Sequence, residues 1–228
     1  MYKLRSDRPV VLKIGCLDFP KLSEAVFSKE PSLLCNSPTA VRAQGGSLSK
    51  IALAHVEKHY ASEIGRAEKE GLSASVDVRV QRLMPGMYPS IPGWHCDAVP
   101  RGSVSGQPNF DAVHPRAFHV AVLLSSEHSG VSNTQFVDQD VMFKLWDVEG
   151  TTRYSQLHAA VEKLGPQVIH ARDGEFVKFT QRTVHRAMPA GRRGWRMFFR
   201  FSMIENPEIR NAVPEQQQVY IIKEGGGW

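Results

Sequence analysis

The apolar positions of the chain predict one long helix near its start. Between residues 47 and 70, apolar side chains recur every three or four positions, the spacing of a helix with one buried face. These residues are Leu48, Ile51, Ala52, Val56, Ile64 and Ala67. A serine at position 47 or 49 can cap this helix, and Gly71 can end it. A second, shorter helix is predicted over residues 155–164, before a Gly-Pro pair.

Short strands are predicted for most of the remaining chain. Residues 75–84 alternate valines with polar residues, the period-two pattern of a half-buried strand. Further strands are predicted over residues 117–126, 134–143 and 195–204. The runs QVIHAR and EFVKFT flank Asp173-Gly174. This dipeptide between two apolar runs predicts a hairpin.

These elements predict a mainly β protein with flanking helices, of the α+β class. Short strands at regular spacing favour a sandwich or barrel of the jelly-roll kind over a βαβ array. No repeat, low-complexity tract or linker divides the chain, so we expect one domain over residues 1–228. Within it we expect a helical N-terminal portion, about residues 1–74, and a jelly-roll core, about residues 75–205.

Composition narrows the class of protein without changing this picture. The chain has 42% apolar and 22% charged residues, which is typical of a globular protein rather than a disordered one. Its three cysteines lack metal-ligand spacing, which argues against a disulfide framework or a structural zinc module. The sequence shows neither a membrane-length apolar run nor the pattern of a signal peptide, so we expect a cytoplasmic protein with no membrane partner.

A histidine stands two residues before a carboxylate at two places, His55/Glu57 and His95/Asp97. The first pair lies in the predicted long helix, where positions i and i+2 are about 200° apart and cannot close on one ion. In an extended segment the same two positions point the same way. His95 and Asp97 can therefore face one metal ion from one side, although such a pair by itself proves little.

A third potential ligand further along the chain supports a metal site at this pair. His185 lies 90 residues after His95, at the end of a predicted strand. Two histidines and one carboxylate on one face of a metal, with the other positions open, form the facial triad of non-heme Fe(II) oxygenases. The sequence thus offers His95, Asp97 and His185 as one candidate ligand set.

The strand over residues 195–204 carries candidate anion-binding groups. Strand alternation puts Arg196, Phe198, Arg200 and Ser202 on one face. A guanidinium inside a cavity needs an anion, and its planar fork suits a carboxylate. The alternative is that this face points to solvent while the intervening apolar residues fill the core.

Together these features resemble the Fe(II)- and 2-oxoglutarate-dependent oxygenase superfamily, with its HxD…H…R pattern on a double-stranded β-helix (a jelly-roll, cupin-like fold), over about residues 76–204. The resemblance implies that Fe(II) is held by the catalytic residues His95, Asp97 and His185. It implies that 2-oxoglutarate is bound by Arg200 or Arg196, with Ser202 and Thr134. Arg200-Phe-Ser202 matches the family's Arg-x-Ser signature, whereas Arg196 has the His-to-Arg spacing of the taurine-dioxygenase branch, so the choice between the arginines stays open.

The resemblance implies an oxidoreductase, a dioxygenase that consumes O2 and 2-oxoglutarate. Asp97 favours hydroxylation or a related oxidation, because halogenating members lack this carboxylate. We expect a small-molecule substrate such as an amino acid or a small acid. The net charge of +5 suggests a nucleic-acid base hydroxylase or demethylase as an alternative, although no basic groove with clustered aromatics supports nucleic acid as a partner. A non-catalytic jelly-roll binding protein is another alternative, but such a protein would usually have lost one of the three ligands.

Overall fold

The structure is a computed structural model that describes residues 2–12, 22–102, 105–126, 130–146, 148–214 and 218–221. Its helices are α1 (Glu24–Phe27), α2 (Pro38–Gln44), α3 (Ser47–Lys69), the short 3-10 helix η1 (Phe110–Ala112) and α4 (Arg153–Leu164). Strands outnumber helices, and every pair of named strands is antiparallel. The prediction of a β-rich α+β fold is confirmed. No described helix is both long and apolar enough to cross a membrane.

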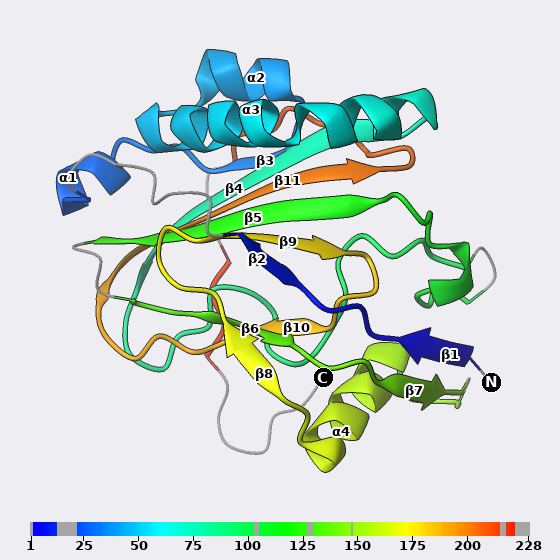
Figure 1. The fold of residues 1–228 in the computed structure, drawn as a ribbon. Coiled ribbons are helices and arrows are strands. Elements are labelled where there is room, and N and C mark those ends of the chain that lie inside the picture. Colours follow the sequence, from blue (N-terminus) through cyan, green and yellow to red (C-terminus); the bar gives the residue numbers. More distant parts are fainter. Residues whose placement is uncertain are drawn as a thin grey trace.

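The largest sheet has six strands and lies below the helices α2 and α3 (Figure 1). Its strands, in spatial order, are β2 (Val10–Leu12), β9 (Phe176–Thr180), β5 (Phe118–Ser125), β11 (Gly194–Ile204), β4 (Ser73–Leu83) and β3 (Leu33–Asn36). The apolar stripe of α3 faces this sheet, and its residues Leu48, Ala52 and Val56 are fully buried there. Burial of this stripe is what holds the helix against the sheet.

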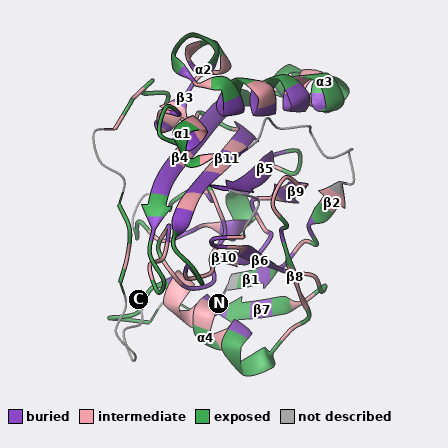
Figure 2. Ribbon diagram, turned by 90° about the vertical axis from the view of Figure 1, so that its left-hand side faces the viewer, coloured by how far each residue is buried: buried purple, intermediate pink, exposed green. Residues whose placement is uncertain are grey.

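A second layer lies on the other side of the large sheet (Figure 2). It contains a three-stranded sheet, β10 (His185–Ala187), β6 (Thr134–Val137) and β8 (Val168–His170), and the pair β1 (Tyr2–Arg5) and β7 (Met142–Leu145). Helix α4 packs against β7. A separate apolar core, which includes Trp94, Phe110 and Leu157, fills this layer.

Strand β11 has an apolar face on one side of the large sheet and a polar face on the other. Met197, Phe199 and Phe201 are buried in the core beneath the helices. Arg196 and Arg200 alternate with them and line a cavity between the two layers. The polar face of β11 therefore points into the molecule and not to solvent.

Three sequence expectations differ from the observed elements. The single strand predicted over residues 134–143 is two strands, β6 and β7, and these belong to different sheets. The N-terminal portion predicted as helical holds α1, α2 and α3 but also β1, β2 and β3, which extend both layers.

The prediction that the strands on either side of Asp173-Gly174 form a hairpin is wrong. Strand β8 pairs with β6, whereas β9 pairs with β5 and β2, so this turn carries the chain from one sheet to the other. The turn is anchored to the large sheet, because Gly174 N donates to the Leu123 carbonyl (2.7 Å) and Ser125 Oγ donates to Asp173 (2.9 Å). Gly174 has a φ of +80°, a conformation that favours glycine in turns. The prediction of a turn at this position is therefore correct, but the two strands it joins do not pair with each other.

Candidate active site

Three potential metal ligands from distant parts of the chain meet between the two layers. His95 and His185 form an isolated antiparallel bridge, in which each backbone N–H donates to the other's carbonyl at 2.9 Å. One ligand atom from each of His95, Asp97 and His185 can be chosen so that all lie within 4.8 Å of one another. The Asp97 carboxylate is 3.7 Å from His95 Nε2 and 3.3 Å from His185 Nε2. The backbone bridge is thus what brings the second imidazole to the HxD segment.

Both imidazoles are oriented by backbone carbonyls. Nδ1 of His95 lies 2.9 Å from the Gly93 carbonyl, and Nδ1 of His185 lies 3.0 Å from the Thr183 carbonyl. A carbonyl only accepts, so Nδ1 carries a proton, and in the neutral tautomer Nε2 is the nitrogen that can bind a metal. This arrangement is typical of metal-binding histidines, whose second nitrogen is held by a hydrogen bond.

The protonation states of the cluster suit a cation. Burial, with His185 nearby, lowers the pKa of His95 to about 4, so its imidazole is neutral near pH 7. Burial alone would raise the pKa of Asp97, but the Arg200 guanidinium and His185 hold it well below its ordinary value. Metal ligands must be deprotonated in this way. The donor set and its charge therefore fit a divalent ion.

Arg200 is engaged by two carboxylates. Its Nη1 donates to Asp97 and its Nη2 donates to Asp77 on β4. Asp77 also accepts the backbone N–H of Cys35 at 2.9 Å. The Arg200 guanidinium thus holds the Asp97 side chain in place by a hydrogen bond, and Asp77 in turn holds the guanidinium.

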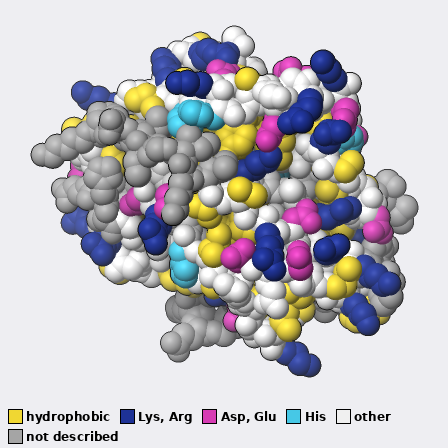
Figure 3. All heavy atoms as spheres, viewed as in Figure 1, with side chains coloured by type: hydrophobic (Ala, Val, Ile, Leu, Met, Phe, Trp, Pro, Cys, Tyr) yellow, Lys and Arg dark blue, Asp and Glu magenta, His cyan; other side chains and the backbone are white. Residues whose placement is uncertain are grey.

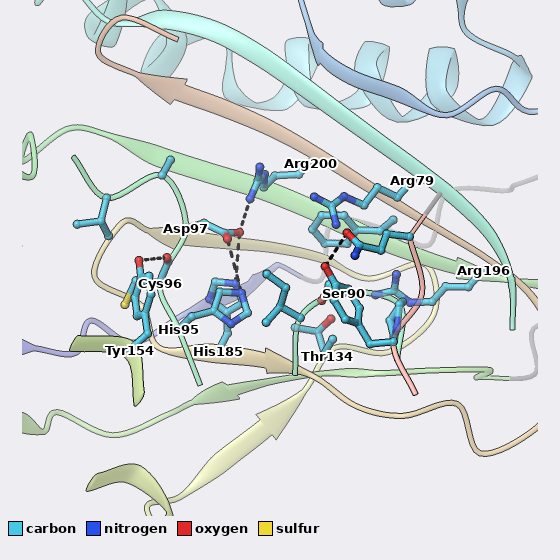
Figure 4. Close-up of a pocket in the computed structure, with 18 of the residues that line it drawn as sticks. Arg79, Ser90, His95, Cys96, Asp97, Thr134, Tyr154, His185, Arg196 and Arg200 are labelled. Atoms are coloured by element: carbon cyan, nitrogen blue, oxygen red, sulfur yellow. Dashed lines mark hydrogen bonds and ion pairs between the residues drawn. The ribbon is translucent and has the colours of Figure 1, made fainter. Parts of the chain in front are cut away.

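The cluster lies at one end of a cavity of about 420 Å³. Arg196 lies toward the other end, and Thr134 lies between it and His185 (Figure 4). Arg196 is 3% exposed, and its Nε donates to the Ser132 carbonyl at 3.2 Å. It makes no ion pair with a described residue. Burial and the neighbouring Arg79 lower its pKa to about 9, as expected for a buried cation without a counter-ion.

Ser202 stands apart from the other predicted site residues. Its hydroxyl is 2.8 Å from Nδ1 of the buried His119, and it does not line the cavity. The structure therefore brings six of the seven predicted residues to one cavity and places Ser202 behind it.

Several cavity residues were not predicted. They are Arg79 on β4, Arg101 and Tyr154 near the metal cluster, and Gln218 and Tyr220 from the C-terminal segment. Alternation along residues 75–84 would have put Arg79 on the face of Asp77. The C-terminal segment carries no comparable signal, because it is placed by a bridge between Tyr220 and Tyr88.

The site thus defines a class: a protein that can hold one divalent metal through two histidines and a carboxylate, beside a cavity lined with guanidinium groups. Comparison with known proteins adds only similarities of fold. No family model and no curated protein matches the chain.

Solved structures similar to the chain include a dioxygenase and a monooxygenase. AviO1 from Streptomyces viridochromogenes Tue57 is 15% identical, with a TM-score of 0.37 over 72% of this chain and 63% of AviO1. An N-substituted L-amino acid dioxygenase from Burkholderia ambifaria AMMD, solved with alpha-KG, is 17% identical, with a TM-score of 0.31 over 55% of this chain and 47% of that one. The non-heme monooxygenase ThoJ, solved as a nickel complex, is 12% identical, with a TM-score of 0.36 over 85% and 89%.

The chain spans less than two thirds of the length of the first two of these proteins. Every one of the three TM-scores is below 0.5, so no residue role is taken from these structures.

Proposed function

We propose that the chain is an Fe(II)- and 2-oxoglutarate-dependent dioxygenase that hydroxylates or otherwise oxidises a small molecule, such as an amino acid or a small acid. The observation that carries this proposal is the convergence of His95, Asp97 and His185 at one end of a cavity whose other end holds Arg196, which makes no ion pair with a described residue. We also propose that the two layers form a double-stranded β-helix within a single domain.

Iron suits this ligand set because two imidazoles and one carboxylate leave coordination positions open for other molecules. Bound Fe(II), with 2-oxoglutarate and O2, would supply the oxidation chemistry. The protein's part is to hold the ion, orient both substrates and exclude water. Phe136 and Phe179 pack beside His185, with ring centroids 5.4 and 5.1 Å from the imidazole, and shield the ligand from solvent.

Of the two candidate arginines, we assign Arg196 to 2-oxoglutarate. Arg200 bonds directly to Asp97, so its guanidinium is already neutralised and lies beside the proposed metal. Arg196 is four residues along the same strand, about 13 Å away at the usual rise. 2-Oxoglutarate chelates with its keto acid end and carries its second carboxylate at the other end, so the arginine that binds this carboxylate must lie away from the ion. The Thr134 hydroxyl lies between the two ends and can donate to the same molecule.

Arg200 then has a different role, as a positioning residue for Asp97. Its Nη1 donates to Oδ2 of Asp97, which leaves Oδ1, 3.7 Å from His95 Nε2, to face the metal. Asp77, 9% exposed at its side chain, completes this arrangement.

The proposal is tested by anaerobic titration of the protein with Fe(II) and 2-oxoglutarate. We expect a weak visible charge-transfer band in the wild-type protein and none in His95→Ala or His185→Ala. His59→Ala, which changes an exposed histidine on α3, serves as the control and should keep the band. A band of equal strength in both ligand variants, or no band in the wild type, would refute the proposal.

A further inference from the structure

The charged side chains of the cavity are mostly positive, whereas those of the surface are of both signs. On the face shown in Figure 3, basic and acidic side chains of the described residues are interspersed. The cavity is lined by four guanidinium groups, those of Arg79, Arg101, Arg196 and Arg200, and by one carboxylate, that of Asp97. Such one-sided charge in a partly enclosed space favours anionic ligands.

The charges that the proposed function already requires balance one another. In the proposed complex, the positive charges of Fe(II), Arg196 and Arg200 equal in number the negative charges of Asp77, Asp97 and the two carboxylates of 2-oxoglutarate. Arg79 and Arg101 are left over. Arg101 is exposed, so solvent screens its charge, and its guanidinium lies over the Tyr154 ring at 5.7 Å. Arg79 is half-buried and has no such compensation.

Arg79 is held in the cavity by the sheet. It pairs with Phe198 in the β4–β11 register, so it lies diagonally between Arg200 and Arg196 on the face that lines the cavity. Figure 4 shows it between these two arginines. Its guanidinium makes neither an ion pair nor a hydrogen bond with a described residue. A half-buried cation whose donors have no partner among the described residues, and which lies beside a second cation, is stabilised when an anion binds.

We propose that Arg79 binds an anionic group of the oxidised substrate, so that this substrate is a small-molecule acid carrying a carboxylate or a similar oxyanion. The inference rests on the proposed function, because it assumes that 2-oxoglutarate takes Arg196. Depth separates the two sites. Arg196 is 3% exposed, whereas Arg79 is half-buried and therefore more accessible to a second molecule when 2-oxoglutarate is bound.

The test uses the anaerobic Fe(II)·2-oxoglutarate complex and a panel of small acids, each paired with its primary amide. The panel contains free and N-acylated amino acids, hydroxy acids and aromatic acids. Binding is read from the change in the charge-transfer band, which requires no turnover. The variants are Arg79→Gln and, as a matched control on the same strand, Arg82→Gln, whose exposed side chain pairs with Glu24 at 3.6 Å.

We expect at least one acid to bind the wild-type complex while its amide does not. Arg79→Gln should weaken binding of that acid by about tenfold or more, as for loss of a charge-assisted hydrogen bond, and leave the 2-oxoglutarate titration within about twofold. Arg82→Gln should change neither titration.

Three results would overturn the inference while the band itself remains. One is a panel in which no acid binds better than its amide, including a panel in which nothing binds. Another is equal binding of the acid by wild type and Arg79→Gln. The third is a loss of 2-oxoglutarate affinity in Arg79→Gln as large as in Arg196→Gln, which would assign Arg79 to the co-substrate. Absence of the band in the wild type would instead refute the proposed function.

Discussion

Arg196 and Arg200 occupy the same face of the same strand, yet their surroundings are opposite. Arg200 bonds to two carboxylates, and these raise its pKa despite its burial. The guanidinium of Arg196 donates to a backbone carbonyl and lies over the Phe198 ring, but it makes no ion pair with a described residue, and its pKa is lowered. The difference shows that the role of a buried arginine depends on which carboxylates reach it. In the proposed function, Arg200 positions the metal ligand Asp97, whereas Arg196 and Arg79 bind anionic groups.

The largest effect is expected at the metal end. Asp97→Ala removes a proposed ligand and one partner of Arg200, so Fe(II) affinity should fall by more than about 100-fold, beyond the range typical of outer-shell changes. Anaerobic equilibrium dialysis measures this loss. Asp111→Ala, on the exposed 3-10 helix, is the control and should bind like wild type. Undiminished Fe(II) binding by Asp97→Ala would remove Asp97 from the ligand set.

The two arginines should separate in a 2-oxoglutarate titration. Arg196→Gln should weaken 2-oxoglutarate binding by about 30-fold or more, because a buried charge pair is lost, and leave Fe(II) binding unchanged. Arg200→Gln should mainly weaken Fe(II) binding, because Asp97 loses its support. Spectroscopic titration of each component distinguishes the two effects. The reverse pattern would return the co-substrate to Arg200.

Asp77 should matter to stability more than to ligand binding. Asp77→Asn removes one of two charges that compensate a nearly buried guanidinium, so the free energy of unfolding should fall by about 3 kcal/mol. Chemical denaturation measures it. The matched control is Glu24→Gln, which breaks the exposed pair with Arg82 and should cost less than about 1 kcal/mol. Equal effects of the two variants would contradict a special role for the Asp77–Arg200 contact.

Acid should destabilise the protein gradually, by a smaller amount per pH unit than the loss of Asp77. Burial lowers the pKa of His95 to about 4 and that of His119 to about 3, both below the ordinary value of 6.5. The unfolded chain then binds more protons than the folded one, so stability of the metal-free protein is full above about pH 6.5 and falls as the pH drops toward 4. Each histidine should contribute about 1 kcal/mol per pH unit in this window. Denaturation of His119→Gln at pH 7 and pH 5 should show a shallower slope, and an unchanged slope would exclude His119 as a contributor.

Local patterns predicted the elements well where one pattern governs a whole segment. Helix α3 and strands β4, β5 and β11 lie close to where the sequence patterns predicted them, because one pattern of apolar residues runs along each of these elements. A local sequence pattern does not indicate which strands pair with each other. The Asp173-Gly174 turn has the residues of a hairpin, but its strands find partners in different sheets.

The same limit applies to the site. Spacing brought out His95, Asp97 and His185, and alternation put Arg196 and Arg200 on one face. Neither spacing nor alternation could show that Asp77, 123 residues before Arg200, would neutralise that arginine. Nor could they show that Ser202 would bond to His119, since both contacts depend on strand register across the sheet.

The most direct test of the account is a crystal structure of the protein prepared anaerobically with Fe(II) and 2-oxoglutarate. We predict one ion bound by Nε2 of His95, the Asp97 carboxylate and Nε2 of His185, with the distal carboxylate of 2-oxoglutarate on Arg196 and Arg200 still bonded to Asp97. An ion bound elsewhere, or a distal carboxylate held by Arg200, would contradict it.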